Sequence, residues 1–319
     1  MKEQMRAVVS GGAGFLGYVL VKKLLSEGCG AAALVRRENK RTEELRGLGA
    51  GIIPADTPMS ERQNENTGGF DIFYHFAWDG VSSEARNDGE RQRNNVQTCL
   101  SAVQNAAALG CRLFVFAGSQ AEYGRHDGMI RETADRRPVS EYGKAKLEAA
   151  AECEKLALRL GMRFLHLMIF NVYGPGDREN SLIGMCCRTF EKGGCAKLGS
   201  GTQIWNYMYI DDFTEAVYKL SLVCLSDTEL PASMRVNIGS AVSRPLYEYV
   251  DRLYASSSKR GTFERDPAVI NPEGSPSVEP DVSELNRLTG FRERFPFEKG
   301  IKETLLYERK KDLFSDSLL

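Results

Sequence analysis

Short apolar runs alternate with longer segments of helical periodicity from the first residues of this 319-residue chain. Alternation of this kind indicates parallel strands that are joined by crossover helices. The runs that predict strands cover residues 7–10, 31–35, 52–54, 72–77, 113–118 and 164–170. The clearest helical patterns, with apolar residues three and four apart, cover 15–27, 94–109 and 141–160. We therefore predict an α/β fold built on a doubly wound parallel sheet.

A glycine-rich segment separates the first predicted strand from the first predicted helix. Gly11, Gly14 and Gly17 stand three apart, and the helical pattern opens with Phe15 and Leu16. Residues without side chains let the backbone approach a pyrophosphate, and the first N–H groups of the helix supply donors and partial positive charge. The segment therefore predicts a site for a dinucleotide coenzyme. A glycine-rich turn without a ligand is the alternative.

Arg36 and Arg37 follow the second predicted strand, where the adenosine ribose of a bound dinucleotide would lie. An acidic residue at this point would bind the 2′-hydroxyl, whereas arginine accommodates a 2′-phosphate. We therefore expect NADP(H), with NAD(H) as the alternative if these cations only line a solvated loop. Asp56, after the third predicted strand, is a candidate acceptor for the adenine amino group, although loop aspartates often only cap turns.

Tyr142 and Lys146 stand four residues apart in a helical pattern, so both side chains lie on one face of the helix. A phenol is a poor proton carrier at neutral pH, but a nearby ammonium favours its ionised form and makes it usable as acid or base. Ser119 follows the strand predicted at 113–118, at the sheet edge where ligands of such folds bind. We expect all three residues to be catalytic, with the Ser119 hydroxyl holding the reacting oxygen.

The charge balance and the cysteine spacing argue against several kinds of partner. With 42 basic and 43 acidic residues the formal net charge is -1, so no global field would attract nucleic acid or an anionic membrane. No apolar stretch has the length of a membrane span, and the first residues lack the apolar core of a secretion signal, so we expect a cytoplasmic protein. The eight cysteines and three histidines lack paired ligand spacing, so no metal site is expected.

The chain is expected to contain two interleaved regions, because the alternation weakens after Pro175 and resumes only over 211–224 and 235–239. We predict a dinucleotide-binding region over 1–174, resumed at about 208–240. A smaller α/β substrate-binding region would comprise 175–207 and 241–319. Within it, the proline-rich stretch 266–280 predicts a surface loop.

Several segments together resemble those of extended short-chain dehydrogenase/reductases of the sugar-nucleotide epimerase and dehydratase type. The segments are 11–17 (GGAGFLG), 75–78 (HFAW), 118–124 (GSQAEYG), 142–146 (YGKAK), 170–177 (FNVYGPGD) and 209–212 (YIDD). The resemblance runs through most of the chain, and it implies a sugar-nucleotide substrate. It also implies a homodimer that packs through the helices around 94–109 and 141–160.

The resemblance also implies roles for individual residues. Lys146 would hold the nicotinamide ribose, and Asn171 would lie near both coenzyme and substrate. Together with the motifs, it gives as cofactor-binding residues Gly11, Gly14, Phe15, Leu16, Gly17, Arg36, Arg37, Asp56, Ala77, Trp78, Tyr142, Lys146, Phe170 and Val172. The expected substrate-binding residues are Trp78, Ser119, Gln120, Asn171, Arg178 and Trp205.

Two departures from the family pattern narrow the reaction. Gln120 and Ala121 occupy the positions where hexose 4,6-dehydratases carry an acidic pair, so dehydration is disfavoured. Trp205 stands where many relatives have an arginine that binds the substrate diphosphate. Arg178 or Arg188 would then replace that arginine, unless both are only solvated surface charges and the substrate differs.

Two reactions fit these expectations. Arg36 and Arg37 favour a reductase, which draws fresh NADPH at every turnover, and Trp78 also resembles reductases of 4-keto sugars. We therefore expect reduction of the carbon-4 ketone of a nucleotide-linked 6-deoxyhexose, with Tyr142 delivering the proton. Epimerisation at carbon 4 with a tightly held NAD is the alternative. A non-catalytic dinucleotide sensor is a third interpretation, disfavoured because such a protein would be free to lose the catalytic residues and none is lost.

Overall fold

A seven-stranded parallel sheet forms the centre of the computed structural model, which describes residues 4–55, 69–82, 85–126, 128–269 and 277–315. Its strand order is β11-β7-β5-β4-β1-β2-β3, and every neighbouring pair is parallel. The strands are β1 (Arg6–Ser10), β2 (Gly30–Val35), β3 (Gly51–Pro54), β4 (Ile72–His75), β5 (Leu113–Ala117), β7 (Arg163–Ile169) and β11 (Ser233–Ile238). The predicted doubly wound parallel sheet is confirmed.

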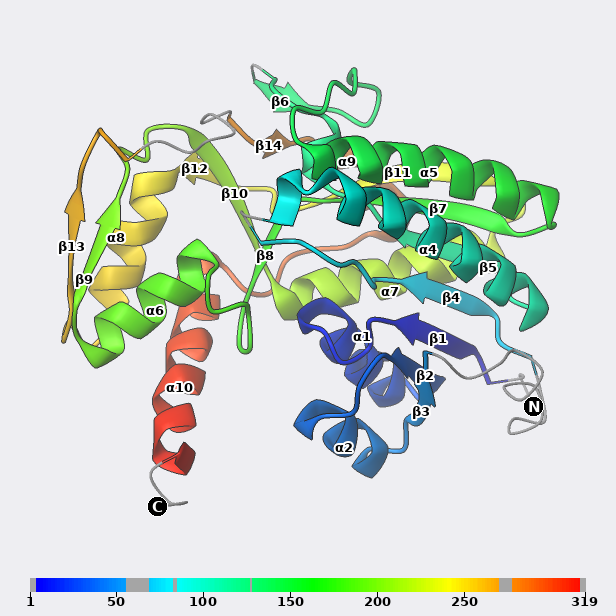
Figure 1. Cartoon of the computed structure of the whole chain (residues 1–319), viewed down its shortest axis with the longest axis horizontal. Helices are drawn as coiled ribbons and strands as arrows, with labels where there is room; N and C mark the ends of the chain where they lie inside the picture. The colour runs from blue at the N-terminus through cyan, green and yellow to red at the C-terminus, as the bar shows by residue number, and fades with distance from the viewer. Residues whose placement is uncertain (1–3, 56–68, 83–84, 127, 270–276, 316–319) are drawn as a thin grey trace.

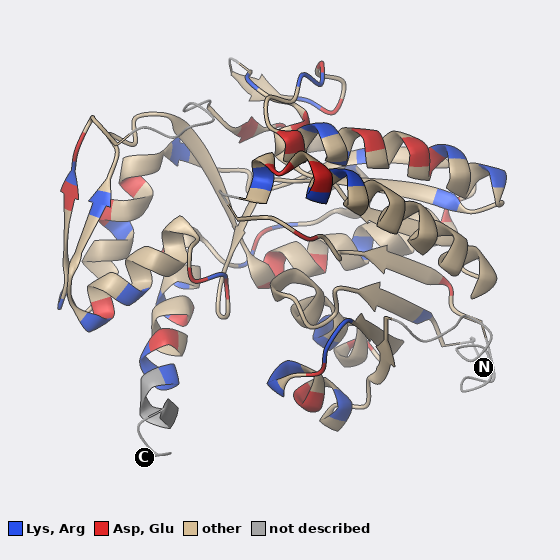
Figure 2. Ribbon diagram, viewed as in Figure 1, with Lys and Arg blue, Asp and Glu red and all other residues tan. Residues whose placement is uncertain are grey.

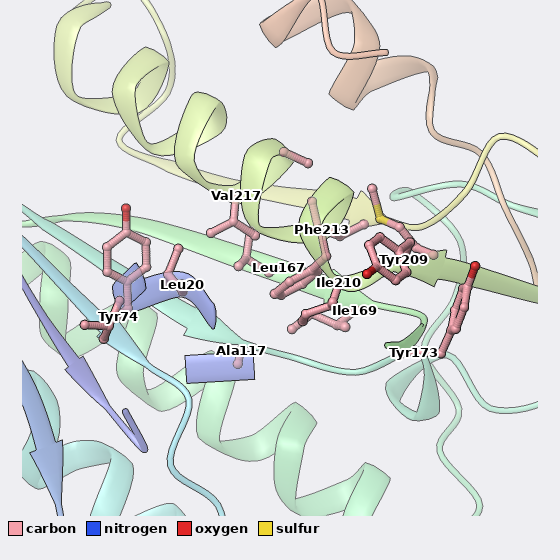
Figure 3. Packing of buried hydrophobic residues seen from close by; sticks show 14 of the residues in the cluster. Leu20, Tyr74, Ala117, Leu167, Ile169, Tyr173, Tyr209, Ile210, Phe213 and Val217 are labelled. Atoms are coloured by element: carbon pink, nitrogen blue, oxygen red, sulfur yellow. The ribbon is translucent and has the colours of Figure 1, made fainter. Parts of the chain in front are cut away.

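Helices cover both faces of this sheet (Figure 1). The helices α1 (Phe15–Ser26) and α7 (Ile210–Ser226) pack on one face, and α4 (Gly89–Ala108) and α5 (Glu141–Arg159) pack on the other. Because successive strand residues point to opposite faces, Val8 packs with α4 and α5 whereas Val9 packs with α1 and α7. Figure 3 shows Phe213 and Val217 of α7 against the strand that carries Leu167.

Side-chain caps set where the two long helices on the second face begin. Ser140 Oγ accepts the Gly143 N–H at 3.2 Å, so α5 starts at the predicted residue. The helix predicted at 94–109 begins at Gly89 instead, because the Asp88 carboxylate accepts the Arg91 N–H at 3.1 Å. The polar first turn of α4 hides this start from a pattern of apolar spacing.

Smaller elements lie outside the large sheet, and several of them gather beyond one of its ends, on the left of Figure 1. Three short sheets pair β8 (Asn171–Tyr173), β10 (Ile204–Tyr209) and β12 (Ser243–Pro245); β9 (Cys195–Leu198) and β13 (Thr262–Arg265); and β6 (Met129–Ile130) and β14 (Glu279–Pro280). The helices α6 (Leu182–Lys192), α8 (Leu246–Ser256) and α10 (Phe297–Ser315) lie together on the left of Figure 1. Two further helices pack on elements of the large sheet: α2 (Lys40–Gly47) on β3, and α9 (Ser283–Thr289) on α7 and β11. The division into two regions at 174–175 stays a prediction.

The stretch 266–280 differs in part from the predicted surface loop. Residues 270–276 lie outside the described residues. Val278 and Pro280 are buried, and Pro280 belongs to β14, which pairs with β6 in parallel. The proline-rich composition predicted a loop here, but the pairing of Pro280 with Ile130 forms a short strand.

Acidic and basic residues are interspersed on the outer surface of α5 (Figure 2). Lys144 pairs with Glu141, and Lys155 pairs with Glu152, both at 2.7 Å. Opposite charges three residues apart on a helix offset one another, so this helix carries no field of a single sign. Within the described ranges, no helix combines the length and the apolar composition that crossing a bilayer requires.

Candidate active site

The glycine loop between β1 and α1 is so tightly folded that its backbone leaves no room for side chains at two positions. Gly11 has a φ of 73°, and a Cβ there would lie 2.8 Å from the Ala77 nitrogen at the end of β4. A Cβ at Gly17 would lie 2.4 Å from the Gly11 carbonyl oxygen. The Gly14 N–H donates to that same carbonyl at 2.8 Å. The turn therefore requires glycine at 11 and 17, and Ala77 lies beside the loop.

The first turn of α1 is open to a ligand. Gly14, at the N-cap, is exposed, no side chain caps this end, and the first turn contains no acidic residue. Phe15 and Leu16 are half-buried against the core, so their backbone rather than their side chains would face a ligand. Because the first N–H groups of a helix lack intrahelical partners and carry partial positive charge, this end could hold the pyrophosphate of a dinucleotide.

Cations follow β2 at the same edge of the sheet. Arg36 is 77% exposed at its side chain, and its nearest described carboxylate atom is Asp79 Oδ1, at 4.0 Å. Arg37 is also exposed. Arg41 has a different place: it donates to the carbonyls of Ala13 at 3.3 Å and Gly176 at 2.8 Å, and so ties the glycine loop to the loop after β8. Arg36 and Arg37 are therefore the pair that could face a 2′-phosphate, and Asp56 lies outside the described residues.

Ser119, Tyr142 and Lys146 come together at the carboxyl ends of β4 and β5. The Tyr142 phenol lies close enough to the Ser119 side chain for that side chain to lower the phenol's pKa. Lys146 Nζ lies 5.9 Å from the centre of the Tyr142 ring and donates to the Ala117 carbonyl at 2.7 Å. Trp78 completes the group, because the centre of its ring lies 3.6 Å from Lys146 Nζ and 5.8 Å from that of Tyr142. Residues far apart in the sequence thus form one polar cluster.

Burial shifts both titrating groups of this cluster towards their neutral forms. It lowers the pKa of Lys146 to about 8, although the charge of Glu122 opposes the shift. Burial also raises the pKa of Tyr142 above its ordinary value, whereas the hydrogen bond with Ser119 and the positive charges of Arg86 and Arg178 act to lower it. The pair can therefore exchange a proton with a ligand near physiological pH.

The buried ammonium of Lys146 should make stability depend on pH. Its pKa is about 8 in the folded protein and 10.5 ordinarily, so between these values the unfolded chain binds more protons and stability rises with pH. Relative to Lys146→Met, the free energy of unfolding of the wild type should rise by about 3 kcal/mol across this window. Urea unfolding at a series of pH values measures the difference. Lys144→Met, at an exposed neighbour, should show no such trend, and a flat difference for Lys146→Met would contradict the assignment.

Two buried amides on α4 hold the segment that carries Trp78. Gln92 Oε1 accepts the Trp78 Nε1–H at 2.9 Å, and its Nε2 donates to the carbonyls of Gly80 and Ala85. Asn95 bonds both the N–H and the carbonyl of Asp79, each at 2.9 Å. Sequence reasoning missed both residues. The sequence contains a sign of their role, because both polar side chains stand on the otherwise apolar, buried face of α4.

The predicted substrate-binding residues lie in two places. Gln120 is half-buried in the turn after Ser119. Arg178 donates to the Val81 carbonyl at 3.1 Å, and its positive charge is close enough to lower the pKa of Tyr142. Asn171 donates to the Asn206 carbonyl at 3.1 Å. Trp205 lines a separate cavity of about 320 Å³, whose other walls include Tyr207, Leu246, Tyr247 and Arg265.

Three further predicted residues have other surroundings. The Phe170 side chain packs in a buried cluster with Tyr123 and Met168, so it contributes to the core. Val172 is half-buried against the core beside β10. Arg188 donates to the Glu179 carbonyl, on the exposed surface of the loop before α6. Of the two arginines considered as replacements at position 205, only Arg178 thus lies near Tyr142.

The chain is similar to enzymes that act on nucleotide-linked sugars. The UDP-N-acetyl-alpha-D-glucosaminuronate decarboxylase of Bacillus cytotoxicus is 26% identical over 96% of this chain and 98% of its own. The dTDP-6-deoxy-L-talose 4-dehydrogenase (NAD(P)(+)) of Kitasatospora kifunensis is 26% identical over 93% of this chain and 94% of its own. These relatives catalyse different reactions, so the similarity indicates a shared class of enzyme rather than one reaction.

A solved structure shares the fold. The UDP-glucose-4-epimerase of Stenotrophomonas maltophila superposes with a TM-score of 0.84 and 19% identity, over 98% of this chain and 100% of the epimerase chain. At this identity the similarity concerns the fold alone. The family pattern described as NAD dependent epimerase/dehydratase matches residues 7–239. Because this match covers most of the chain, the chain belongs to the NAD dependent epimerase/dehydratase family.

Proposed function

We propose that this protein is an NADPH-dependent reductase that acts on the carbon-4 ketone of a nucleotide-linked 6-deoxyhexose. The observation that carries the proposal is the proximity of Tyr142 to Ser119 and Lys146 at the sheet edge that also bears the glycine loop. A phenol, a hydroxyl and an ammonium at one point suit the transfer of a proton to a ketone oxygen.

The residues at this edge fit a dinucleotide coenzyme. Gly11 and Gly17 leave no room for a Cβ beside the loop backbone, and the first turn of α1 has neither a cap nor an acidic side chain. These features suit a pyrophosphate, while Lys146 could bond the nicotinamide ribose. When bound, the coenzyme would supply the hydride to carbon 4.

The protein's own residues would supply the proton. Tyr142 would donate its phenolic proton to the oxygen on carbon 4, and the Ser119 hydroxyl would bond the same oxygen. The adjacent ammonium of Lys146 would stabilise the phenolate that remains. Because burial raises the pKa of Tyr142, the phenol begins protonated, as a reductase requires.

Two features support carbon 4 of a 6-deoxy sugar as the reacting position. The relative from Kitasatospora kifunensis is, by its name, a 4-dehydrogenase of a 6-deoxy sugar nucleotide. Gln120 and Ala121 offer no carboxylate beside Ser119, so an acid that could remove water from the sugar is missing at these two positions. We propose that the sugar lies against Trp78 and Arg178, between the two predicted regions of the chain.

Epimerisation at carbon 4 is the second candidate, because the matched family includes epimerases and shares its fold with a UDP-glucose-4-epimerase. The purified protein should first be denatured to identify any dinucleotide that it retains. Turnover of nucleotide-linked 4-keto-6-deoxyhexoses is then measured with NADPH and with NADH. Stoichiometric consumption of NADPH supports reduction. Retained NAD, with interconversion of sugar nucleotides and no net consumption, would instead establish an epimerase.

The preference for NADPH should depend on Arg36 and Arg37. Charge-assisted hydrogen bonds to a phosphate contribute enough that replacing both residues by alanine should weaken NADPH binding by roughly 10- to 100-fold. NADH binding should stay close to wild type, because NADH lacks the 2′-phosphate. Fluorescence titration with each coenzyme measures both affinities. Arg112→Ala, an exposed arginine at the opposite end of β5, is the matched control. Equal weakening of both coenzymes would contradict the assignment.

We also propose that the protein forms a homodimer through α4 and α5, which lie side by side on one face of the sheet. From Asn94 to Ala108, α4 has no charged residue, although Gln97, Ser101 and Gln104 are exposed. A long uncharged exposed face suits burial against a second copy, since the core of an interface is depleted in charge. Light scattering of the purified protein tests the dimer.

A further inference from the structure

A buried carboxylate lies directly behind Ser119. Glu122 ends the short turn η2 (Gln120–Glu122), and its side chain is 0% exposed. Its Oε1 accepts the Ser119 backbone N–H at 2.9 Å, while Ser119 Oγ accepts the Ala121 N–H at 3.2 Å. The two bonds fix both the backbone and the hydroxyl of Ser119, and the hydroxyl proton stays available for a ligand or for Tyr142.

His166 on β7 contacts the same oxygen of this carboxylate. Its Nε2 lies 3.1 Å from Glu122 Oε1, and the imidazole is itself buried. Gly118 makes room for the pair, because a Cβ there would lie 2.2 Å from His166 Nε2 and 2.7 Å from Glu122 Oε1. The glycine, the histidine and the carboxylate therefore form one packed unit under the catalytic serine. Burying a carboxylate is costly, so its position behind a reacting group calls for an explanation.

Charged and titratable groups face Glu122 from several elements. Arg136 Nη1, from the loop before α5, lies 3.8 Å from Glu122 Oε2. Lys146 and Tyr142 on α5, and Tyr123 beside η2, are near enough for the charge of Glu122 to affect their protonation. Burial opposes ionisation of Glu122, but His166, the Ser119 N–H and Lys146 together hold its pKa below the ordinary value. Glu122 is therefore a carboxylate at neutral pH.

We propose that Glu122, held by His166, is a positioning residue of the proton-transfer site, which orients Ser119 towards Tyr142 and keeps a negative charge behind both. That charge opposes ionisation of Tyr142 and favours the ammonium form of Lys146. The phenol is thus kept ready to donate a proton, which is the direction that reduction needs. The benefit of a protonated Tyr142 for reduction rests on the proposed function. The orientation of Ser119 by Glu122 and the negative charge behind Ser119 are independent of that function.

Glu122→Gln tests the charge, because glutamine keeps the shape and an acceptor for the Ser119 N–H. We expect the ionisation midpoint of Tyr142 in the coenzyme-bound protein to fall by about 1 pH unit. Ultraviolet difference absorbance of the phenolate, with Tyr142→Phe as the blank, measures this midpoint without any substrate. In turnover of a 4-keto sugar nucleotide, kcat should decline at a correspondingly lower pH, while KM for the coenzyme stays unchanged.

Glu132→Gln is the matched control, because Glu132 is a partly buried carboxylate that accepts the Asn237 N–H at 3.0 Å and has no described bond to Ser119. It should leave the midpoint of Tyr142 where it is. Arg136→Gln removes the cation beside Glu122 and should move the midpoint upwards. Since Arg136 is partly exposed, this variant serves even if Glu122→Gln fails to fold.

The outcomes separate this proposal from the proposed function. An unchanged midpoint in Glu122→Gln, or an unchanged or lower midpoint in Arg136→Gln, would overturn the role of Glu122. If Glu122→Gln lowers the melting temperature but leaves the ionisation midpoint of Tyr142 unaltered, Glu122 and His166 only stabilise the fold. That result would also overturn the proposed role of Glu122. If the midpoints shift as expected but no 4-keto sugar nucleotide is reduced, the proposed function fails and the role of Glu122 stands.

Discussion

Replacing Tyr142 by phenylalanine is expected to lower kcat by about 10²- to 10⁴-fold, the contribution of one positioned proton donor. Coenzyme affinity should stay near wild type, because the ring keeps its edge contact with Trp78 at 5.8 Å and its place under the Arg86 guanidinium at 4.7 Å. Only the hydroxyl that meets Ser119 is lost. Consumption of NADPH with a saturating 4-keto sugar nucleotide measures the effect.

Coenzyme binding by this variant can be followed through tryptophan fluorescence, because the chain has only two tryptophans. In a Trp205→Phe background the signal comes from Trp78, which lies within the cluster. Tyr173→Phe is the matched control: it removes a buried hydroxyl that donates to the Phe297 carbonyl at 3.1 Å, and should cost about 1 kcal/mol of stability without lowering kcat. A Tyr142→Phe protein with full activity would show that the proton takes another route.

Six of the seven central strands could be predicted, because most of them are buried runs of apolar residues between helices of clear periodicity. In β4 and β5, every residue is buried, so neither strand shows the alternation of a half-exposed sheet. The strands outside the large sheet could not be read in this way. For example, β9 has four residues with alternating exposure, and β13 is mostly exposed. Runs so short and polar resemble loops in composition.

The polar cluster around Tyr142 could be predicted from spacing, because Tyr142 and Lys146 share one helix face and Ser119 follows a strand at the sheet edge where ligands of such folds bind. The residues that support it could not. Glu122 stands in the polar turn after β5, but nothing in the sequence places His166, 44 residues later, beside it. Arg41 belongs to a run of cations whose composition predicts an exposed loop. Its guanidinium nevertheless donates a hydrogen bond to the carbonyl of Gly176, 135 residues later. Contacts of this kind depend on tertiary packing rather than on local pattern.

Gly17→Ala should be the most damaging single change for coenzyme binding. The added Cβ would lie 2.4 Å from the Gly11 carbonyl oxygen, 2.9 Å from the Gly11 carbonyl carbon and 3.0 Å from the Gly12 Cα. All three are backbone atoms of the glycine loop, so no side chain can rotate away to make room. The loop must therefore separate from α1, and overpacking of this kind costs about 1–3 kcal/mol of stability.

Displacing the loop also removes the backbone donors that would hold a pyrophosphate. Losing two such charge-assisted bonds should weaken the binding of both NADPH and NADH by at least about 100-fold. Calorimetric titration measures the affinities, and thermal unfolding without coenzyme measures the stability. Gly47→Ala is the matched control, since the same methyl group there, at the end of α2, meets no atom within 4 Å and should leave both quantities near wild type. If Gly17→Ala binds coenzyme like the wild type, the dinucleotide cannot lie on this loop, because the loop cannot keep its shape around the added carbon.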